Sequence, residues 1–164
     1  MNRIKLAIVS FGFLGCSPVV PGTVGTLGGV LVAWLLRDTA WFPLWVALVC
    51  AGLYAVSLPL GGWAERHAGR KDPGIFVVDE VIGYLITVAW VRGPSPLALL
   101  LAFFVFRFFD IVKPQPARAM EKIRGGHGIL LDDVVAGVWG FVAVMLPARL
   151  LLDQLDWFSG GGAS

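Results

Sequence analysis

Charged side chains recur at regular spacing within one strongly apolar stretch of the sequence. In residues 103–114, FFVFRFFDIVKP, Arg107, Asp110 and Lys113 are three residues apart. Positions three apart share a face of a helix, so we expect these side chains to point in roughly one direction. Ionisable groups are costly in such surroundings, and they usually mark a functional site.

Two adjacent acidic pairs lie in other apolar stretches, Asp79–Glu80 in VVDEV and Asp132–Asp133 in LLDDVV. With Asp110 they supply five carboxylates, which suit Mg²⁺ because this ion prefers oxygen ligands and bridges to phosphates. Without a cation, five carboxylates packed together would repel one another. Arginine and lysine side chains beside them would hold phosphate oxygens. The pattern therefore predicts magnesium and phosphate chemistry.

A glycine-rich turn, PGTVGT at residues 21–26, is a further candidate. Its amides and the hydroxyls of Thr23 and Thr26 could hold a phosphate group, or its glycines could simply let helices pack closely. The turn lacks the GK[ST] ending of a Walker loop. Both interpretations stay open on the sequence alone.

The charged groups also have structural interpretations. Arg107 and Asp110 could form a plain salt bridge, and Lys113 could anchor the chain at a membrane surface. The acidic pair at 132–133 could cap the start of a helix, and His127 in GGHG is expected in a flexible loop. A functional interpretation requires that these groups converge, which depends on how the chain is organised.

The composition indicates an integral membrane protein. The 164 residues are 57% hydrophobic and 15% charged, with a mean hydropathy of +0.80, whereas soluble domains carry roughly 25% charged residues. We expect a single membrane domain over residues 1–158 and a disordered tail, SGGGAS, over residues 159–164. A formal net charge of +2 without an extended basic tract argues against nucleic-acid binding.

The predicted fold is an all-α, polytopic helical bundle with about five spans. The expected spans are residues 24–36, 40–60, 75–91, 96–112 and 134–152, after an N-terminal stretch, 6–20, that lies along the membrane surface or re-enters it. Lysine and arginine gather in residues 61–74 and 113–133, which predicts that these loops and the N-terminus are cytoplasmic. In this topology the acidic groups and the glycine-rich turn meet at the cytoplasmic ends of the helices.

Four motifs, in this order, resemble those of the phosphatidylglycerophosphatase A family: SPVVPGTVGTLGG, IFVVDEVIGYLIT, FRFFDIVKPQPAR and GGHGILLDDVVAG. The likeness extends over residues 15–140. It implies a magnesium-dependent enzyme of the bacterial inner membrane, active at the cytoplasmic face, that removes the terminal phosphate of phosphatidylglycerophosphate. The matching positions are Pro21, Gly22, Thr23, Gly25, Thr26, Asp79, Glu80, Gly83, Arg107, Asp110, Lys113, Pro114, Gly128, Asp132, Asp133 and Gly137.

The resemblance also implies roles for individual residues. The expected metal ligands are Asp79, Glu80, Asp132 and Asp133. The expected phosphate-binding residues are Arg107, Lys113, Thr23 and Thr26. Catalysis is expected to depend on the four ligands and Asp110, with attack on phosphorus by a metal-activated water or by Asp110 through an aspartyl phosphate. The sequence predicts no oligomeric state.

Two other functions fit less well. CDP-alcohol phosphotransferases carry D-x2-D-G-x2-A-R-x8/9-G-x3-D-x3-D, and here Lys113 and Ala136 stand where two of the aspartates are required, with Pro114 in place of glycine. A small non-catalytic cation transporter would spread its acidic groups through the depth of the membrane. In the predicted topology these groups instead lie at one level.

Overall fold

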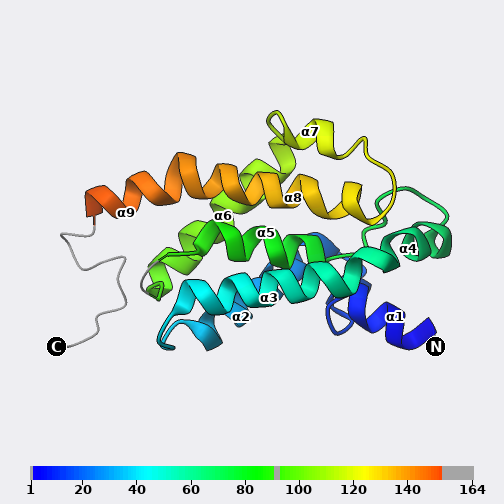
Figure 1. The fold of residues 1–164 in the computed structure, drawn as a ribbon, viewed down its shortest axis with the longest axis horizontal. Helices are drawn as coiled ribbons and strands as arrows, with labels where there is room; N and C mark the ends of the chain where they lie inside the picture. Colours follow the sequence, from blue (N-terminus) through cyan, green and yellow to red (C-terminus); the bar gives the residue numbers. More distant parts are fainter. Residues whose placement is uncertain (1, 91–92, 153–164) are drawn as a thin grey trace.

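A computed structural model of the chain describes residues 2–90 and 93–152, and within these ranges its regular elements are helices joined by turns and loops (Figure 1). The α-helices are α1 (Asn2–Val9), α2 (Pro21–Leu36), α3 (Phe42–Ser57), α4 (Gly61–Ala68), α5 (Val78–Val88), α6 (Pro96–Val112), α7 (Ala117–Met120), α8 (Gly126–Gly140) and α9 (Leu146–Leu152). Short 3₁₀ turns are η1 (Leu14–Cys16) and η2 (Leu58–Leu60), and a π-helical turn, η3 (Phe141–Met145), joins α8 to α9. The all-α prediction is confirmed for these residues, while the tail predicted at 159–164 lies outside them.

Helix α5 forms the centre of the bundle. It packs against α8, α2, α3 and α6, and most of its residues are buried. Its sequence, VDEVIGYLITV, is apolar on all sides apart from the acidic pair in its first turn. A helix that is apolar all round is expected in the interior, and α5 is surrounded by its neighbours rather than exposed.

Close glycine packing joins α5 to α8. A Cβ on Gly137 would clash with the backbone oxygen of Gly83, so the two helices touch through their backbones here. The Thr87 hydroxyl, one turn further along α5, donates to the backbone oxygens of Gly83 (2.9 Å) and Gly137 (3.2 Å). Small residues allow this kind of contact between membrane helices. Asp79 and Asp133 each lie four residues before one of these glycines, which brings their carboxylates close together.

The number of spans differs from the prediction. Within the described residues, two continuous helical segments are long and apolar enough to cross a membrane: Phe42–Ala68, with 27 residues, and Gly126–Leu151, with 26. Helices α2, α5 and α6 have 16, 11 and 17 residues, short of the roughly 20 that a span needs. About five spans are therefore not supported by helix length. The apolar run at 75–91 exceeds its helix because the chain becomes extended at Ala89.

The segments at 61–74 and 6–20 have more local structure than the sequence predicts. The loop expected at 61–74 is helical as far as Ala68, since η2 carries the chain from α3 into α4. The N-terminal stretch, predicted to lie along the membrane surface or to re-enter it, consists of α1, which ends at Val9, and a turn in which Phe11 and Phe13 adopt left-handed backbone conformations. The Val77 amide donates to the Val9 oxygen at 2.9 Å, which ties this segment to the entrance of α5.

The helix ends that carry the predicted site lie toward one end of the bundle. Figure 1 shows that α2, α5 and α8 all start toward the end where α1 and α4 lie, while the turn between α2 and α3 lies at the opposite end. Helix α6 runs the other way and finishes beside α7. Three helix N-termini and one C-terminus therefore frame the region that holds the acidic residues.

Candidate active site

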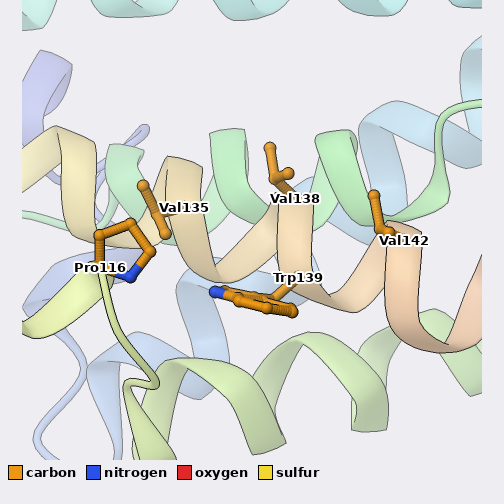
Figure 2. Close-up of a pocket in the computed structure, with 5 residues that line it drawn as sticks. All are labelled: Pro116, Val135, Val138, Trp139 and Val142. Carbon is orange, nitrogen blue, oxygen red and sulfur yellow. The ribbon is translucent and has the colours of Figure 1, made fainter.

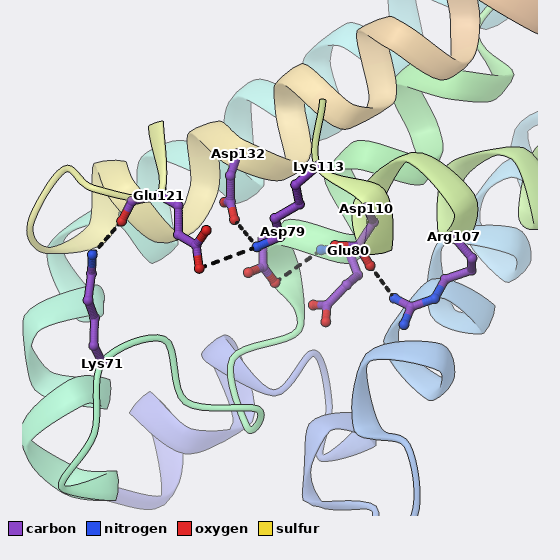
Figure 3. Close-up of polar contacts among 8 residues, drawn as sticks. All are labelled: Lys71, Asp79, Glu80, Arg107, Asp110, Lys113, Glu121 and Asp132. Carbon is purple, nitrogen blue, oxygen red and sulfur yellow. Dashed lines mark hydrogen bonds and ion pairs between the residues drawn. The ribbon is translucent and has the colours of Figure 1, made fainter. Parts of the chain in front are cut away.

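Charged side chains from three helices meet in this region (Figure 3). Each helix contributes at least two of them, and the set consists of Asp79 and Glu80 from α5, Arg107, Asp110 and the C-cap residue Lys113 from α6, and Asp132 and Asp133 from α8. The structure thus brings together every acidic and basic residue that the sequence singled out for the site.

Three of the carboxylates form a compact cluster. One oxygen from each of Asp79, Glu80 and Asp133 lies within 4.8 Å of the others. Asp79 and Asp133 are 5% and 3% exposed, and the buried Glu80 Oε2 has no hydrogen-bond partner among the described residues. Ionised carboxylates at this separation repel one another, and a cation bound between them would relieve that repulsion. All-oxygen donors of this kind fit a hard divalent cation such as Mg²⁺.

The first turn of α2 closes one side of this three-carboxylate cluster. A Cβ on Gly22 would lie 2.5 Å from Glu80 Oε1 and 3.3 Å from Arg107 Nη1, so a larger residue would displace both side chains. The free amides and positive dipole end of a helix N-terminus favour negative charge nearby. The glycine-rich turn therefore makes room for the Glu80 carboxylate and also packs the helices.

The two threonines of this turn are placed differently. Thr26 is fully buried, and its hydroxyl donates to the Gly22 backbone oxygen at 2.9 Å. The structure therefore gives Thr26 a partner within α2 and does not place its hydroxyl among the charged side chains. Thr23 is half-buried in the first turn of α2.

Helix α6 supplies an ion pair to the site. Arg107 Nη1 lies 2.7 Å from Asp110 Oδ2, and both side chains are largely buried. The predicted common face holds for these two residues, which are one turn apart. Lys113 lies beyond the helix, as a C-cap with φ of 45°, and this turn directs it toward α8.

Lys113 pairs with the remaining aspartate. Its Nζ donates to Asp132 Oδ2 at 2.6 Å and lies 3.9 Å from Glu121 Oε1. Burial by itself would lower the pKa of Lys113, but the hydrogen bond and charge of Asp132 outweigh it and raise the pKa above its ordinary value. Lys113 is therefore a fixed positive charge beside the carboxylates.

Adjacent positions on α8 separate Asp132 from Asp133. Successive helical residues are about 100° apart, so Asp133 faces α5 while Asp132 reaches Lys113. Neither residue caps the helix, because α8 begins at Gly126 and the two lie well inside it. His127 is likewise not in a loop: it lies in the first turn of α8, with its Nδ1 2.8 Å from the Tyr54 hydroxyl.

Two residues near the site were missed at the sequence level. The Lys71 ammonium donates to the backbone oxygen of Glu121, whose carboxylate approaches Lys113. These contacts link the loop after α4 to the chain after α7 beside the site (Figure 3). Lys71 and Glu121 are 50 residues apart in two loops, so no spacing rule signals their contact.

Comparison with known proteins shows which family the chain belongs to. The family profile described as Phosphatidylglycerophosphatase A matches residues 7–148. The chain is 34% identical over 145 residues to a protein of that name from Haemophilus influenzae, covering 88% of each chain. It is 36% identical over 141 residues to one from Escherichia coli, covering 84% of this chain and 78% of the relative.

A third relative carries a different substrate in its name. This protein, from Bacteroides thetaiotaomicron, is provisionally named a phosphatidylinositol-3-phosphatase and is 36% identical over 148 residues, covering 84% of this chain and 89% of its own. No solved structure matches the chain at a significant level. The family match over most of the chain, together with the similarity of these relatives, shows that the chain belongs to the phosphatidylglycerophosphatase A family.

Proposed function

We propose that the protein is a magnesium-dependent lipid phosphatase that hydrolyses the terminal phosphomonoester of phosphatidylglycerophosphate to phosphatidylglycerol and inorganic phosphate. Family membership supports the reaction. The observation that carries the proposal is the cluster of Asp79, Glu80 and Asp133, with the cationic side chains of Arg107 and Lys113 nearby. Acidic oxygens for a divalent cation beside two phosphate-binding cations are what metal-assisted phosphomonoester hydrolysis uses.

The side chains divide into three roles. Asp79, Glu80 and Asp133 would hold Mg²⁺, which when bound would offset their charge and polarise a phosphate oxygen or a water. Arg107 and Lys113 bind the oxygens of the substrate phosphate, with Thr23 as a further donor at the start of α2. Asp132 orients Lys113 and keeps it charged, which differs from its expected place among the metal ligands.

Asp110 admits two chemical routes. Either a water attacks phosphorus directly, or the Asp110 carboxylate attacks and forms an aspartyl phosphate that water then hydrolyses. The ion pair with Arg107 at 2.7 Å withdraws charge from the carboxylate and favours direct attack by water. Acid quenching during turnover, followed by borohydride reduction, tests this assignment, since an aspartyl phosphate would be reduced to homoserine at position 110.

We also propose that the bundle spans the bacterial inner membrane several times, with the site at its cytoplasmic end. Large apolar side chains are exposed along α2 and α6, including Leu31 and Phe104, as well as along the two longer segments. Helices of 16 and 17 residues fall about one turn short of the hydrocarbon core, a mismatch that local thinning of the bilayer can absorb. Helix α5 can be shorter because protein surrounds it.

Aromatic and basic residues support the direction of insertion. Trp34, Trp41 and Trp45 are exposed near the turn between α2 and α3, where an aromatic belt would meet the outer interface. The cationic residues Lys71 and Lys122 lie in loops at the opposite end. In this arrangement the membrane-crossing segments surround the shorter α5, residues 1–158 form one domain, and the N-terminal segment lies at the cytoplasmic surface.

A substrate panel tests the proposed reaction. Purified full-length protein is given phosphatidylglycerophosphate or phosphatidylinositol-3-phosphate in Mg²⁺, and released phosphate is measured. We expect preferential hydrolysis of phosphatidylglycerophosphate. Preference for the inositol lipid would instead assign this chain the activity named for the Bacteroides relative, and release of phosphate from neither lipid would refute the proposal.

The remaining alternatives gain no support from the site. A CDP-alcohol phosphotransferase needs carboxylates where this chain has the cationic Lys113 and the buried Ala136. A cation path would need acidic groups along the bundle, whereas the three-carboxylate cluster lies at the first turn of α5.

A further inference from the structure

An apolar groove runs along the outer face of α8 (Figure 2). Its lining consists of Pro116, Val135, Val138, Trp139 and Val142. The Trp139 indole forms one wall and is held in place, because its Nε1 donates to the backbone oxygen of Gln115 at 3.0 Å. The groove is therefore a shaped surface with one fixed wall.

The groove begins beside the candidate active site. Pro116 belongs to the same short connection as Lys113 and follows it by three residues. Val135 lies three residues after Asp132, the partner of Lys113, so one helical turn separates the charged pair from the apolar lining. From Val135 to Val142 the groove follows α8 and the start of η3 for about 10 Å toward the opposite end of the bundle.

These observations fit one kind of occupant. A phospholipid has a phosphate at one end and acyl chains that extend away from it. Lys113 would lie at the phosphate, and the groove would lie along an acyl chain. All of the lining except Pro116 belongs to a helical segment long enough to cross a membrane, and in the proposed topology this face meets lipid acyl chains. Burying methylene groups in it is favourable only if the groove fits them better than bulk lipid does.

We propose that this groove binds an acyl chain of the lipid substrate and makes the enzyme selective for a chain-bearing phosphate. The inference rests on the proposed function, because it assigns the groove to the substrate of that site. Trp139 is a specificity-determining residue in this account, and its hydrogen bond to Gln115 couples the filled groove to the connection that carries Lys113.

Photolabelling tests the occupant directly. Wild-type protein in mixed micelles is irradiated with phosphatidylglycerophosphate that carries a diazirine in the upper part of one acyl chain. We expect adducts concentrated in residues 135–142, displaced by unlabelled phosphatidylglycerophosphate and not by phosphatidylcholine. Adducts spread equally over other exposed apolar residues, such as Leu31, would overturn the proposal.

A filled groove gives a second test. Val138→Trp blocks the groove, and Leu31→Trp is the matched control because Leu31 is similarly exposed on α2. We expect Val138→Trp to lower kcat/KM for long-chain phosphatidylglycerophosphate at least tenfold, while hydrolysis of the deacylated head group stays unchanged. Equal effects of Val138→Trp and Leu31→Trp on kcat/KM for the lipid would contradict the proposal. So would an equal loss of activity on the lipid and on the deacylated head group in Val138→Trp, if wild-type protein also shows no displaceable labelling at residues 135–142.

The two proposals fail in different ways. If the wild-type protein releases phosphate from neither the lipid nor the head group, the proposed reaction is wrong, while displaceable labelling still reports on the groove. If the wild-type protein hydrolyses the lipid but labelling is uniform, the reaction stands and the groove assignment is wrong.

Discussion

Asp132 and Asp133 are neighbours in the chain, but they have different partners. Asp133 joins Asp79 and Glu80 in the three-carboxylate cluster, whereas Asp132 binds Lys113 at 2.6 Å. In our account Asp133 holds the cation, and Asp132 positions the phosphate-binding Lys113. The two aspartates should therefore differ in what their removal changes.

Asn substitution at each position separates these roles. We expect Asp133→Asn to raise the Mg²⁺ concentration needed for half-maximal activity by more than about 10–100-fold, since even residues that only support metal ligands have effects of that size. Asp132→Asn should act mainly on KM for the lipid, because Lys113 loses its partner. Phosphate release is measured across Mg²⁺ and lipid concentrations.

The exposed Asp38 supplies the control, because it belongs to the turn between α2 and α3, which lies at the opposite end of the bundle (Figure 1). Asp38→Asn should leave both parameters unchanged. Equal Mg²⁺ requirements for the Asp132 and Asp133 variants would contradict the division of roles.

The charge on Lys113 sets an expectation for pH. A raised pKa means that the positive charge is present below the lysine's ordinary value of 10.5 and is lost only as pH rises beyond it. Lys113→Arg keeps the positive charge, so its activity should depend on pH in the same way as that of the wild-type protein up to pH 10.5. A wild-type alkaline limb that shifts in Lys113→Arg below pH 10.5 would show that Lys113 titrates there.

At the scale of helices, the α5–α8 contact sets the distance between the carboxylates. The backbone contact at Gly83 and Gly137 lies one turn from Asp79 and Asp133. Any side chain at position 137 must push the helices apart and separate the acids. Geometry of the three-carboxylate cluster and stability of the bundle therefore depend on the same contact.

Gly137→Ala tests this dependence. We expect a loss of about 1–3 kcal/mol in stability, as for overpacked interiors, together with a higher Mg²⁺ requirement. Gly52→Ala is the control, since its Cβ would meet nothing within 4 Å in the middle of α3. Thermal unfolding in detergent and Mg²⁺ titration of activity give the two readouts. If the Gly137 and Gly52 variants behave alike, the helix contact does not set the site.

Much of the site could be predicted from the sequence because its charges stand out against apolar surroundings. The spacing of Arg107 and Asp110 predicts the common helical face on which their ion pair lies. Of the four predicted metal ligands, Asp79, Glu80 and Asp133 lie together, whereas Asp132 pairs with Lys113. The start of α8 could not be predicted, because GGHG reads as a flexible loop. Gly126 is instead helical, and a Cβ there would clash with the backbone oxygen of Leu58. Local sequence does not distinguish a glycine needed for close packing from one that ends a helix.

At the scale of the whole molecule, hydropathy overstates how many helices are long enough to cross a membrane. The run at 75–91 is apolar because α5 is buried among α2, α3, α6 and α8, so its composition reflects contact with protein. Its 11 residues span only about 16 Å. The same burial places the acidic first turn of α5 inside the bundle, where the other charged helices reach it.

The proposed orientation can be tested in intact cells. In a variant without native cysteines, Asp38→Cys should react with a membrane-impermeant maleimide added to spheroplasts, because the turn after α2 is expected outside. Lys122→Cys should react only after the membrane is opened, because its loop is expected inside. The reverse pattern would contradict the assignment of the site to the cytoplasmic face.

The most direct test of the central claim is Mg²⁺-dependent phosphate release from phosphatidylglycerophosphate by the purified protein. The account predicts activity that chelation abolishes and added Mg²⁺ restores, and that is lost in Asp79→Asn, Glu80→Gln and Asp133→Asn variants that still fold and insert. Full activity in a chelator, or in these correctly folded variants, would contradict it.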